Sequence, residues 1–215
     1  MLVHAVKVPI GSLGMMAAMM SEDPGLTKDI VDMLGEMHLV ATRTTHLIDH
    51  LSTWAAQIGH EHTANPQWIA LEVFVQEVQE LNAAALKHKY LRIETDLALT
   101  KVFTEPEMLR FILRNLVGNA IKFSENATIT IRSRTDGAHH WLLEVAYQGV
   151  GMQPEQLDKL FRWEMRYTHP GTQNEKGTGL GLLLVQEFVR KLRGQLHIQS
   201  VPGQGSTFSI QLPTL

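Results

Sequence analysis

The feature that most constrains the fold is an apolar repeat of helical period between Leu26 and Ile58. Its members alternate at spacings of four and three residues, which places them along one side of a helix. They are Ile30, Leu34, Met37, Ala41, Thr44, Ile48, Leu51, Ala55 and Ile58. The preceding helical segment, Leu2–Met20, is too short to cover this seam. We therefore expect a helical hairpin that pairs with a second copy in a homodimeric four-helix bundle.

The rest of the chain alternates between strand and helix patterns, which predicts a second domain. We expect the hairpin domain over residues 1–58, a linker over 59–65 and the second domain over 66–215. Expected strands are 68–72, 91–96, 128–134, 141–146, 196–200 and 207–212, and expected helices are 74–88, 105–123, 154–161 and one ending near 193. The fold class is therefore α+β, with a mixed sheet covered by helices on one face.

A glycine-rich turn opens the last predicted helix. Gly177, Gly179 and Gly181 occupy alternate positions and precede an amphipathic segment that ends at Arg193. Glycine lets the backbone approach an anion closely, and the first N–H groups of a helix favour negative charge. The turn fits a phosphate-binding loop, although a plain helix-capping turn has the same pattern.

Two further motifs precede this turn. Asn115 and Asn119 are four residues apart and share a helix face, with Lys122 about one turn further on. Amide oxygens can coordinate a hard cation that also touches phosphates, and a lysine can meet a phosphate directly. The third motif, Gly149-Val150-Gly151-Met152, follows an alternating apolar run over residues 141–145.

Taken in chain order, these motifs resemble the N, G1 and G2 boxes of the histidine-kinase ATPase family, whose fold is called Bergerat or GHKL. The resemblance covers about residues 66–213, and Phe161 resembles the F box. It implies that the second domain binds ATP and Mg²⁺, with the metal held by Asn119 and a polar lid over residues 163–176. The residues implied to contact the nucleotide are Asn115, Asn119, Lys122, Tyr147, Gly149, Gly151, Phe161, Lys176, Gly177, Thr178, Gly179, Leu180 and Gly181.

The N-terminal segment His4-Ala5-Val6-Lys7-Val8-Pro9 resembles the H box of two-component sensor kinases. The resemblance implies that His4 accepts the phosphoryl group within a HisKA-type dimerisation and phosphotransfer domain. Pro9 lacks an N–H donor and clashes with the carbonyl of Ala5, which loosens the helix beside His4. The implied function is a sensor kinase transmitter core, which transfers the γ-phosphoryl group of ATP to His4 and then to an aspartate of a response-regulator receiver domain.

Several residues depart from the family pattern. ATP-hydrolysing relatives place a glutamate where Asn115 stands, and an amide cannot take a proton from water, so transfer is favoured over hydrolysis. Tyr147 stands where the family has the aspartate that reads adenine, and Ala5 replaces the acidic neighbour of the histidine. Val8 replaces the polar residue used in dephosphorylating the partner. The alternative is a pseudokinase, a dimeric docking module with weak or no ATP chemistry.

Composition argues against several other classes of protein. A net charge of −3 gives no broad basic surface, so no nucleic-acid partner is expected. The absence of cysteine favours a reducing compartment, and no apolar stretch reaches the length of a membrane span. We expect a cytoplasmic, soluble fragment, with an upstream membrane anchor left open. His46 and His50 have a spacing that can bind metal, but no third ligand is evident.

Overall fold

The structure is a computed structural model. It describes residues 2–23, 25–58, 65–137, 139–161, 169–175 and 179–214, with the side chains of residues 2–7, 39, 42–43, 46–47 and 49–58 left out.

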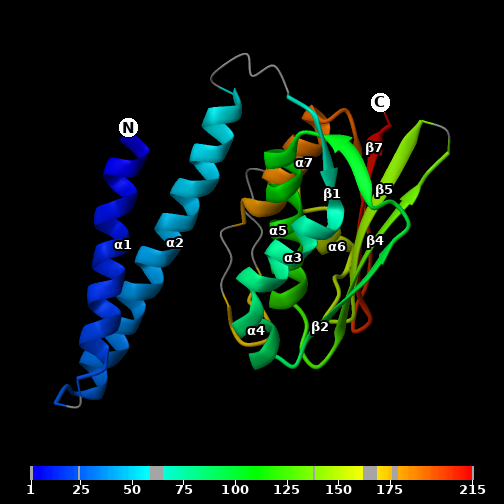
Figure 1. Ribbon diagram of the computed structural model, residues 1–215. Helices are drawn as coiled ribbons and strands as arrows, with labels where there is room; N and C mark the ends of the chain where they lie inside the picture. The colour runs from blue at the N-terminus through cyan, green and yellow to red at the C-terminus, as the bar shows by residue number, and fades with distance from the viewer. Residues whose placement is uncertain are drawn as a thin grey trace. The chain divides into compact units, whose positions relative to one another are not determined.

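The chain divides into two compact units, Met1–His62 and Thr63–Leu215. The first unit consists of two helices, α1 (Leu2–Ser21) and α2 (Lys28–Ile58), which run side by side as a hairpin (Figure 1). Both predicted helices are confirmed, and α1 continues through Pro9. None of the helices within the described residues is long and apolar enough to cross a bilayer.

Small residues bring the two helices of the hairpin close together. A Cβ atom at Gly14 would lie only 2.9 Å from the Cβ of Ala41, so the backbones meet at this point. The Nδ1 atom of His38 lies 2.8 Å from the carbonyl oxygen of Gly14 and adds a polar contact. Ala17 and Leu34 are buried nearby.

Many other apolar side chains of the hairpin, among those described, are exposed. The pairing of α1 with α2 covers only part of the apolar seam, because the two helices together carry more apolar surface than one contact line can bury. The exposed residues are Leu13, Met15, Met16, Met19, Met20, Ile30, Met33, Met37 and Val40. We call this set the uncovered apolar face of the hairpin.

The second unit is built on a five-stranded sheet in the order β2-β4-β5-β7-β6. Only β2 and β4 are parallel; the other neighbours are antiparallel. The strands are β2 (Arg92–Leu97), β4 (Thr128–Thr135), β5 (His140–Tyr147), β6 (Gln195–Val201) and β7 (Gly205–Pro213). A separate antiparallel pair joins β1 (Gln67–Ala70) to β3 (Lys101–Thr104).

Helices cover one face of this sheet. Figure 1 shows α3, α5 and α7 on the same side of the strands, which confirms the predicted mixed-sheet sandwich. Within the described residues, the helices of this unit are α3 (Leu71–Leu81), α4 (Ala83–His88), α5 (Pro106–Lys122), α6 (Pro154–Leu157) and α7 (Gly181–Lys191).

The apolar periodicity of the sequence explains why this face is covered. On β4, Ile129 and Ile131 point into the core and are fully buried, while Thr130 between them faces the other side. On α5, one wide stripe is fully buried against the sheet. Phe188 of α7 meets Phe111 of α5 edge to face, with ring centroids 4.8 Å apart. This contact fixes α7 against α5.

Three predicted boundaries were wrong, and one strand was missed. The helix expected over 74–88 is two helices, which meet at Asn82, where the side-chain amide donates to the carbonyl of Val78 (2.8 Å). The strand expected over 68–72 ends at Ala70, because α3 begins at Leu71. β3 was not predicted at all, and the helix expected over 154–161 stops at Leu157.

Candidate functional site

Helix α5 presents the side chains of the N box. Its start is fixed by Glu105, whose carboxylate accepts a hydrogen bond from the Met108 N–H (2.6 Å), with Pro106 at the first helical position. Asn115 and Asn119 are both half-buried on this helix. The Asn115 amide donates to its own helix, to the carbonyl of Phe111 (2.9 Å).

Asn119 is the better candidate for a cation ligand. Its side chain makes no hydrogen bond to any described residue, so its amide oxygen is available. The described part of the chain contains no group of three or more His, Asp or Glu side chains that could hold a metal. A cation here would therefore be bound by Asn119 together with oxygen atoms of a ligand, an arrangement that suits Mg²⁺.

The G2 turn lies directly against the N box. Gly181 is the first residue of α7, and a Cβ atom there would lie 2.5 Å from the Oδ1 atom of Asn115. Gly179 has a φ of 73°, a conformation that favours glycine. The structure thus brings Gly179, Leu180 and Gly181 to the face of α5 that carries Asn115. Lys176, Gly177 and Thr178, also predicted here, lie outside the described residues.

The G1 turn meets the C-terminal end of the same helix. The Val150 N–H donates to the carbonyl of Phe123 (3.1 Å), and a side chain at Gly149 would collide with that carbonyl. Gly151 has a φ of 62°, and a side chain there would collide with the backbone of Val201. Both predicted glycines are therefore required by the close approach of the backbone.

Lys122 is held by the segment that precedes the G2 turn. Its Nζ atom donates to the carbonyl of His169 (2.8 Å) and lies 4.6 Å from the ring centroid of Phe123. Burial lowers the pKa of the Lys122 ammonium; the carboxylate of Glu175 opposes this shift and the ammonium of Lys89 adds to it. The lysine is placed beside the N box, with a protein carbonyl as its partner.

Tyr147 is part of the hydrophobic core. It is the last residue of β5, is only 7% exposed, and stacks on Phe208 with ring centroids 6.3 Å apart. Its hydroxyl is hydrogen-bonded to Ser206, whose Oγ atom lies 2.8 Å from that of Ser200. Burial raises the pKa of Tyr147 to about 12, and the Ser206 hydrogen bond only partly opposes this shift.

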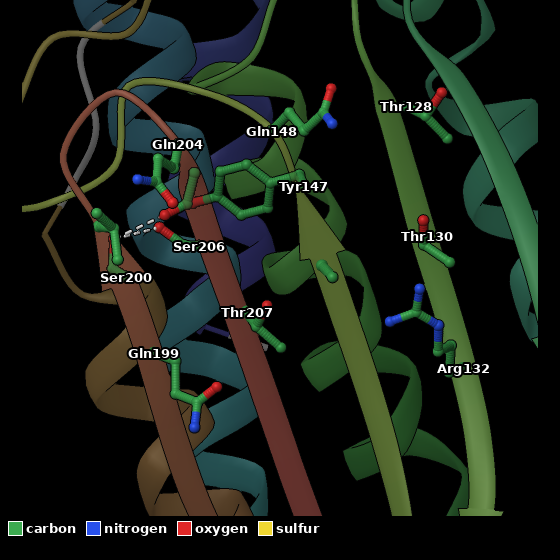
Figure 2. A pocket seen from close by; sticks show the side chains of 13 residues that line it. Thr128, Thr130, Arg132, Tyr147, Gln148, Gln199, Ser200, Gln204, Ser206 and Thr207 are labelled. Atoms are coloured by element: carbon green, nitrogen blue, oxygen red, sulfur yellow. Dashed lines mark hydrogen bonds between the residues drawn. The ribbon is translucent and has the colours of Figure 1, made fainter.

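A polar hollow of about 420 Å³ lies next to Tyr147, on the face of the sheet away from the helices (Figure 2). Threonine, glutamine and serine side chains and one arginine point into it. Its labelled lining residues are Thr128, Thr130, Arg132, Tyr147, Gln148, Gln199, Ser200, Gln204, Ser206 and Thr207. Because α5 packs on the opposite face, this hollow is separate from the N-box side chains.

Two predicted site residues lie outside these three motifs. Phe161 is half-buried in the turn after α6. His4 belongs to α1, but its side chain lies outside the described residues. Sequence reasoning missed Ser124, whose hydroxyl is fully buried near Gly149 without a hydrogen-bond partner among the described residues. A hydroxyl residue directly after the N box was the only available signal.

A model of the family described as histidine kinase-, DNA gyrase B- and HSP90-like ATPase matches residues 104–215. The chain belongs to this family. The match includes the N box on α5, the G1 turn and the G2 turn, which are the elements that the structure brings together. The resemblance read from these motifs to the core of two-component histidine kinases is thereby confirmed. The assignment of the hairpin as a phosphotransfer domain stays a prediction.

Curated relatives extend the similarity to sensor kinases. The aerobic respiration control sensor protein ArcB of Escherichia coli K12 is 26% identical over an alignment 215 residues long, which covers 97% of this chain and 27% of ArcB. The sensor-like histidine kinase SenX3 of Mycobacterium tuberculosis H37Rv is 24% identical over 213 residues, covering 99% of this chain and 52% of SenX3. The chain thus spans between a quarter and about half of the length of these relatives.

Solved structures share the fold. The histidine kinase AdeS of Acinetobacter baumannii matches with a TM-score of 0.68 and 23% identity, covering 98% of both chains. Full-length ShkA, solved in complex with AMPPNP, matches with a TM-score of 0.70 and 23% identity, covering 99% of this chain and 44% of ShkA.

The burial of Tyr147 makes a pH-dependent contribution to stability. An unfolded tyrosine ionises near pH 10, whereas Tyr147 keeps its proton to about pH 12. Its contribution is therefore fully present below pH 10 and is lost as the pH rises to about 12. Between these values the free energy of unfolding should fall by roughly 3 kcal/mol more in the wild type than in Tyr147→Phe. If denaturant titrations show that the free energy of unfolding falls equally in the two proteins, the burial of the Tyr147 hydroxyl is contradicted.

Proposed function

We propose that this chain is the transmitter core of a sensor histidine kinase, which transfers the γ-phosphoryl group of ATP to His4 and then to an aspartate of a response-regulator receiver domain. Family membership supports an ATP-dependent kinase of this class. The similarity to ArcB and SenX3, whose names identify them as sensor proteins, supports the signalling role.

The observation that carries this proposal is the convergence of two distant turns, G1 and G2, on the N box of α5. The G2 turn at Gly181 lies against Asn115, and the G1 turn at Gly149 lies against Phe123, at the other end of the N box. A helix N-terminus with glycines, the Asn119 amide, which has no partner in the described part of the chain, and a lysine thus surround one region. These groups together suit a metal-bound polyphosphate.

In this proposal the chain's residues position and neutralise the phosphates. Asn119 would hold Mg²⁺, which when bound neutralises charge on the phosphate oxygens. The N–H groups at the start of α7 would donate to those oxygens, and Lys122 would exchange the carbonyl of His169 for a phosphate. Asn115 offers no base that could activate water, which favours transfer to a histidine over hydrolysis.

The position of Tyr147 favours the alternative of a pseudokinase. Family members use an aspartate at this position to accept a hydrogen bond from adenine. Here a buried ring, stacked on Phe208 and bonded to Ser206, takes its place. The loss of a charged acceptor costs about 1.5–3 kcal/mol, or roughly 10- to 150-fold in affinity. The pseudokinase would keep the dimeric hairpin as a docking module.

We also propose that the first unit forms a homodimer through the uncovered apolar face of the hairpin. Met33, Met37 and Val40 follow one another at spacings of four and three residues, and each is at least half exposed. An exposed apolar stripe of this kind is expected to be buried in a bundle with a second copy.

Labelling with ATP tests the phosphoacceptor. The full chain, incubated with γ-labelled ATP and Mg²⁺, should gain a label that is stable in base and lost in acid. His4→Gln should remove the label, while His197→Gln, which changes an exposed histidine on β6, should not. Asn119→Ala should lower the labelling at least about tenfold. Acid-stable label, or label retained in His4→Gln, would contradict the assignment.

Tyr147 provides the test between kinase and pseudokinase. Tyr147→Asp should tighten ATP binding by about tenfold or more in calorimetry, because it restores a charged acceptor beside Ser206. Tyr147→Phe is the matched control; it keeps the ring, adds no acceptor and should not tighten binding. If the wild type already binds ATP at low micromolar concentration and Tyr147→Asp changes nothing, the pseudokinase alternative loses its support.

Charged substitutions in the uncovered apolar face test the proposed dimer. The double variant Met37→Glu/Val40→Glu should turn a dimer into a monomer in light scattering, because it places two charges in the uncovered apolar face. Asp32→Lys changes a charge elsewhere on α2 and should leave the dimer intact. A wild-type chain that is monomeric at high micromolar concentration would refute the proposal.

A further inference from the structure

Lys89 is a buried lysine that the proposed chemistry does not use. It follows α4 directly and is only 3% exposed. Its backbone is fixed on both sides, since its N–H donates to the carbonyl of Ala85 (3.0 Å) and its carbonyl accepts from the Asn126 N–H (2.8 Å). A buried ammonium group is costly unless all its protons find partners, so its contacts are informative.

Two of those contacts are with the end of helix α5. The Nζ atom of Lys89 donates to the carbonyl of Ile121 (2.9 Å) and to that of Lys122 (3.1 Å). The last carbonyl groups of a helix have no partner within the helix, and its C-terminal end attracts positive charge. Lys89 therefore caps the N-box helix from outside.

The other contacts of Lys89 reach the segment before the G2 turn. Its Nζ atom donates to the Thr172 hydroxyl (2.8 Å) and forms an ion pair with the carboxylate of Glu175. Burial raises the pKa of the Glu175 carboxyl. Hydrogen bonds from Lys89 and from the Gln173 N–H together lower it by more, so the net shift of the pKa is downward. A helix cap alone would not require these two partners.

The same segment is also joined to α5 through its backbone. The Thr172 N–H donates to the carbonyl of Lys122 (3.0 Å), and the Gly171 N–H donates to the carbonyl of Glu175 (2.9 Å). A Cβ atom at Gly171 would lie 2.6 Å from the carbonyl oxygen of Lys122. One ammonium group thus joins the end of the N-box helix to a compact turn, 171–175, that ends four residues before Gly179.

We propose that Lys89 is a positioning residue of the nucleotide site, which fastens turn 171–175 to the C-terminal end of α5 and so fixes how the chain approaches the phosphate-binding glycines. The contribution of this anchor to ATP binding rests on the proposed function. The anchor itself does not, because its contacts lie within the protein.

Hydrogen exchange of the full chain tests the anchor without a nucleotide. In Lys89→Met and in Glu175→Gln, the amides of residues 171–174 should exchange about tenfold faster or more, as expected when a charged hydrogen bond is lost. Lys87→Met, which changes an exposed lysine on α4, should leave them unchanged. If these amides keep their wild-type rates in both anchor variants, Lys89 is only a helix cap and the proposal is wrong.

Binding of Mg²⁺-ATP and of AMP then tests the positioning role. Both anchor variants should weaken ATP about tenfold, and AMP, whose base has little to bind, serves only as a weak-binding reference; Lys87→Met should leave ATP binding unchanged. ATP binding that is unchanged in both anchor variants would overturn the positioning role. A wild type that binds no ATP, with the predicted exchange rates, would refute the proposed function while the anchor stands.

Discussion

The last carbonyl groups of helix α5 are the constraint on which the second unit depends. A buried carbonyl must be paired, and a helix cannot pair its own last carbonyls. Ile121, Lys122 and Phe123 therefore take donors from three loops that are far apart in the sequence: the end of α4 through Lys89, the G1 turn through Val150, and the turn before G2 through Thr172. The hydrogen-bonding requirement of one helix end thus gathers the loops of the candidate site.

The candidate site has two halves, and only one of them keeps the residues that the family motifs lead us to expect. The half that would meet phosphates keeps its features: the Asn119 amide has no hydrogen-bond partner among the described residues, and Gly181 lies against Asn115. In the half that would meet the base, Tyr147 belongs to the core and is held by stacking and by a serine hydroxyl. A residue with this much buried surface stabilises the fold, so its position is set by packing as much as by any ligand.

Much of this structure could be predicted from the sequence, where a period or a motif was long enough. The two hairpin helices, the N-box helix and the strands β4 to β7 carry clear apolar periods. β3 has only four residues and depends on pairing with β1, which no local pattern reveals. The burial of Lys89 could not be predicted either, since a lysine in a polar stretch normally indicates surface. Its partners lie 32 to 86 positions away and become visible only in the fold.

The account's central claim is that the phosphate half of the site is functional while Tyr147 has replaced the base half. The most direct test is nuclear magnetic resonance of the isotope-labelled chain, titrated in parallel with Mg²⁺-ATP and Mg²⁺-tripolyphosphate. The account predicts that both ligands shift the same amides, those of Asn119 and of residues 179–181, and that ATP adds little at Tyr147, Gly149 and Gly151. Large shifts at those three residues with ATP alone, or no shift at residues 179–181 with either ligand, would contradict it.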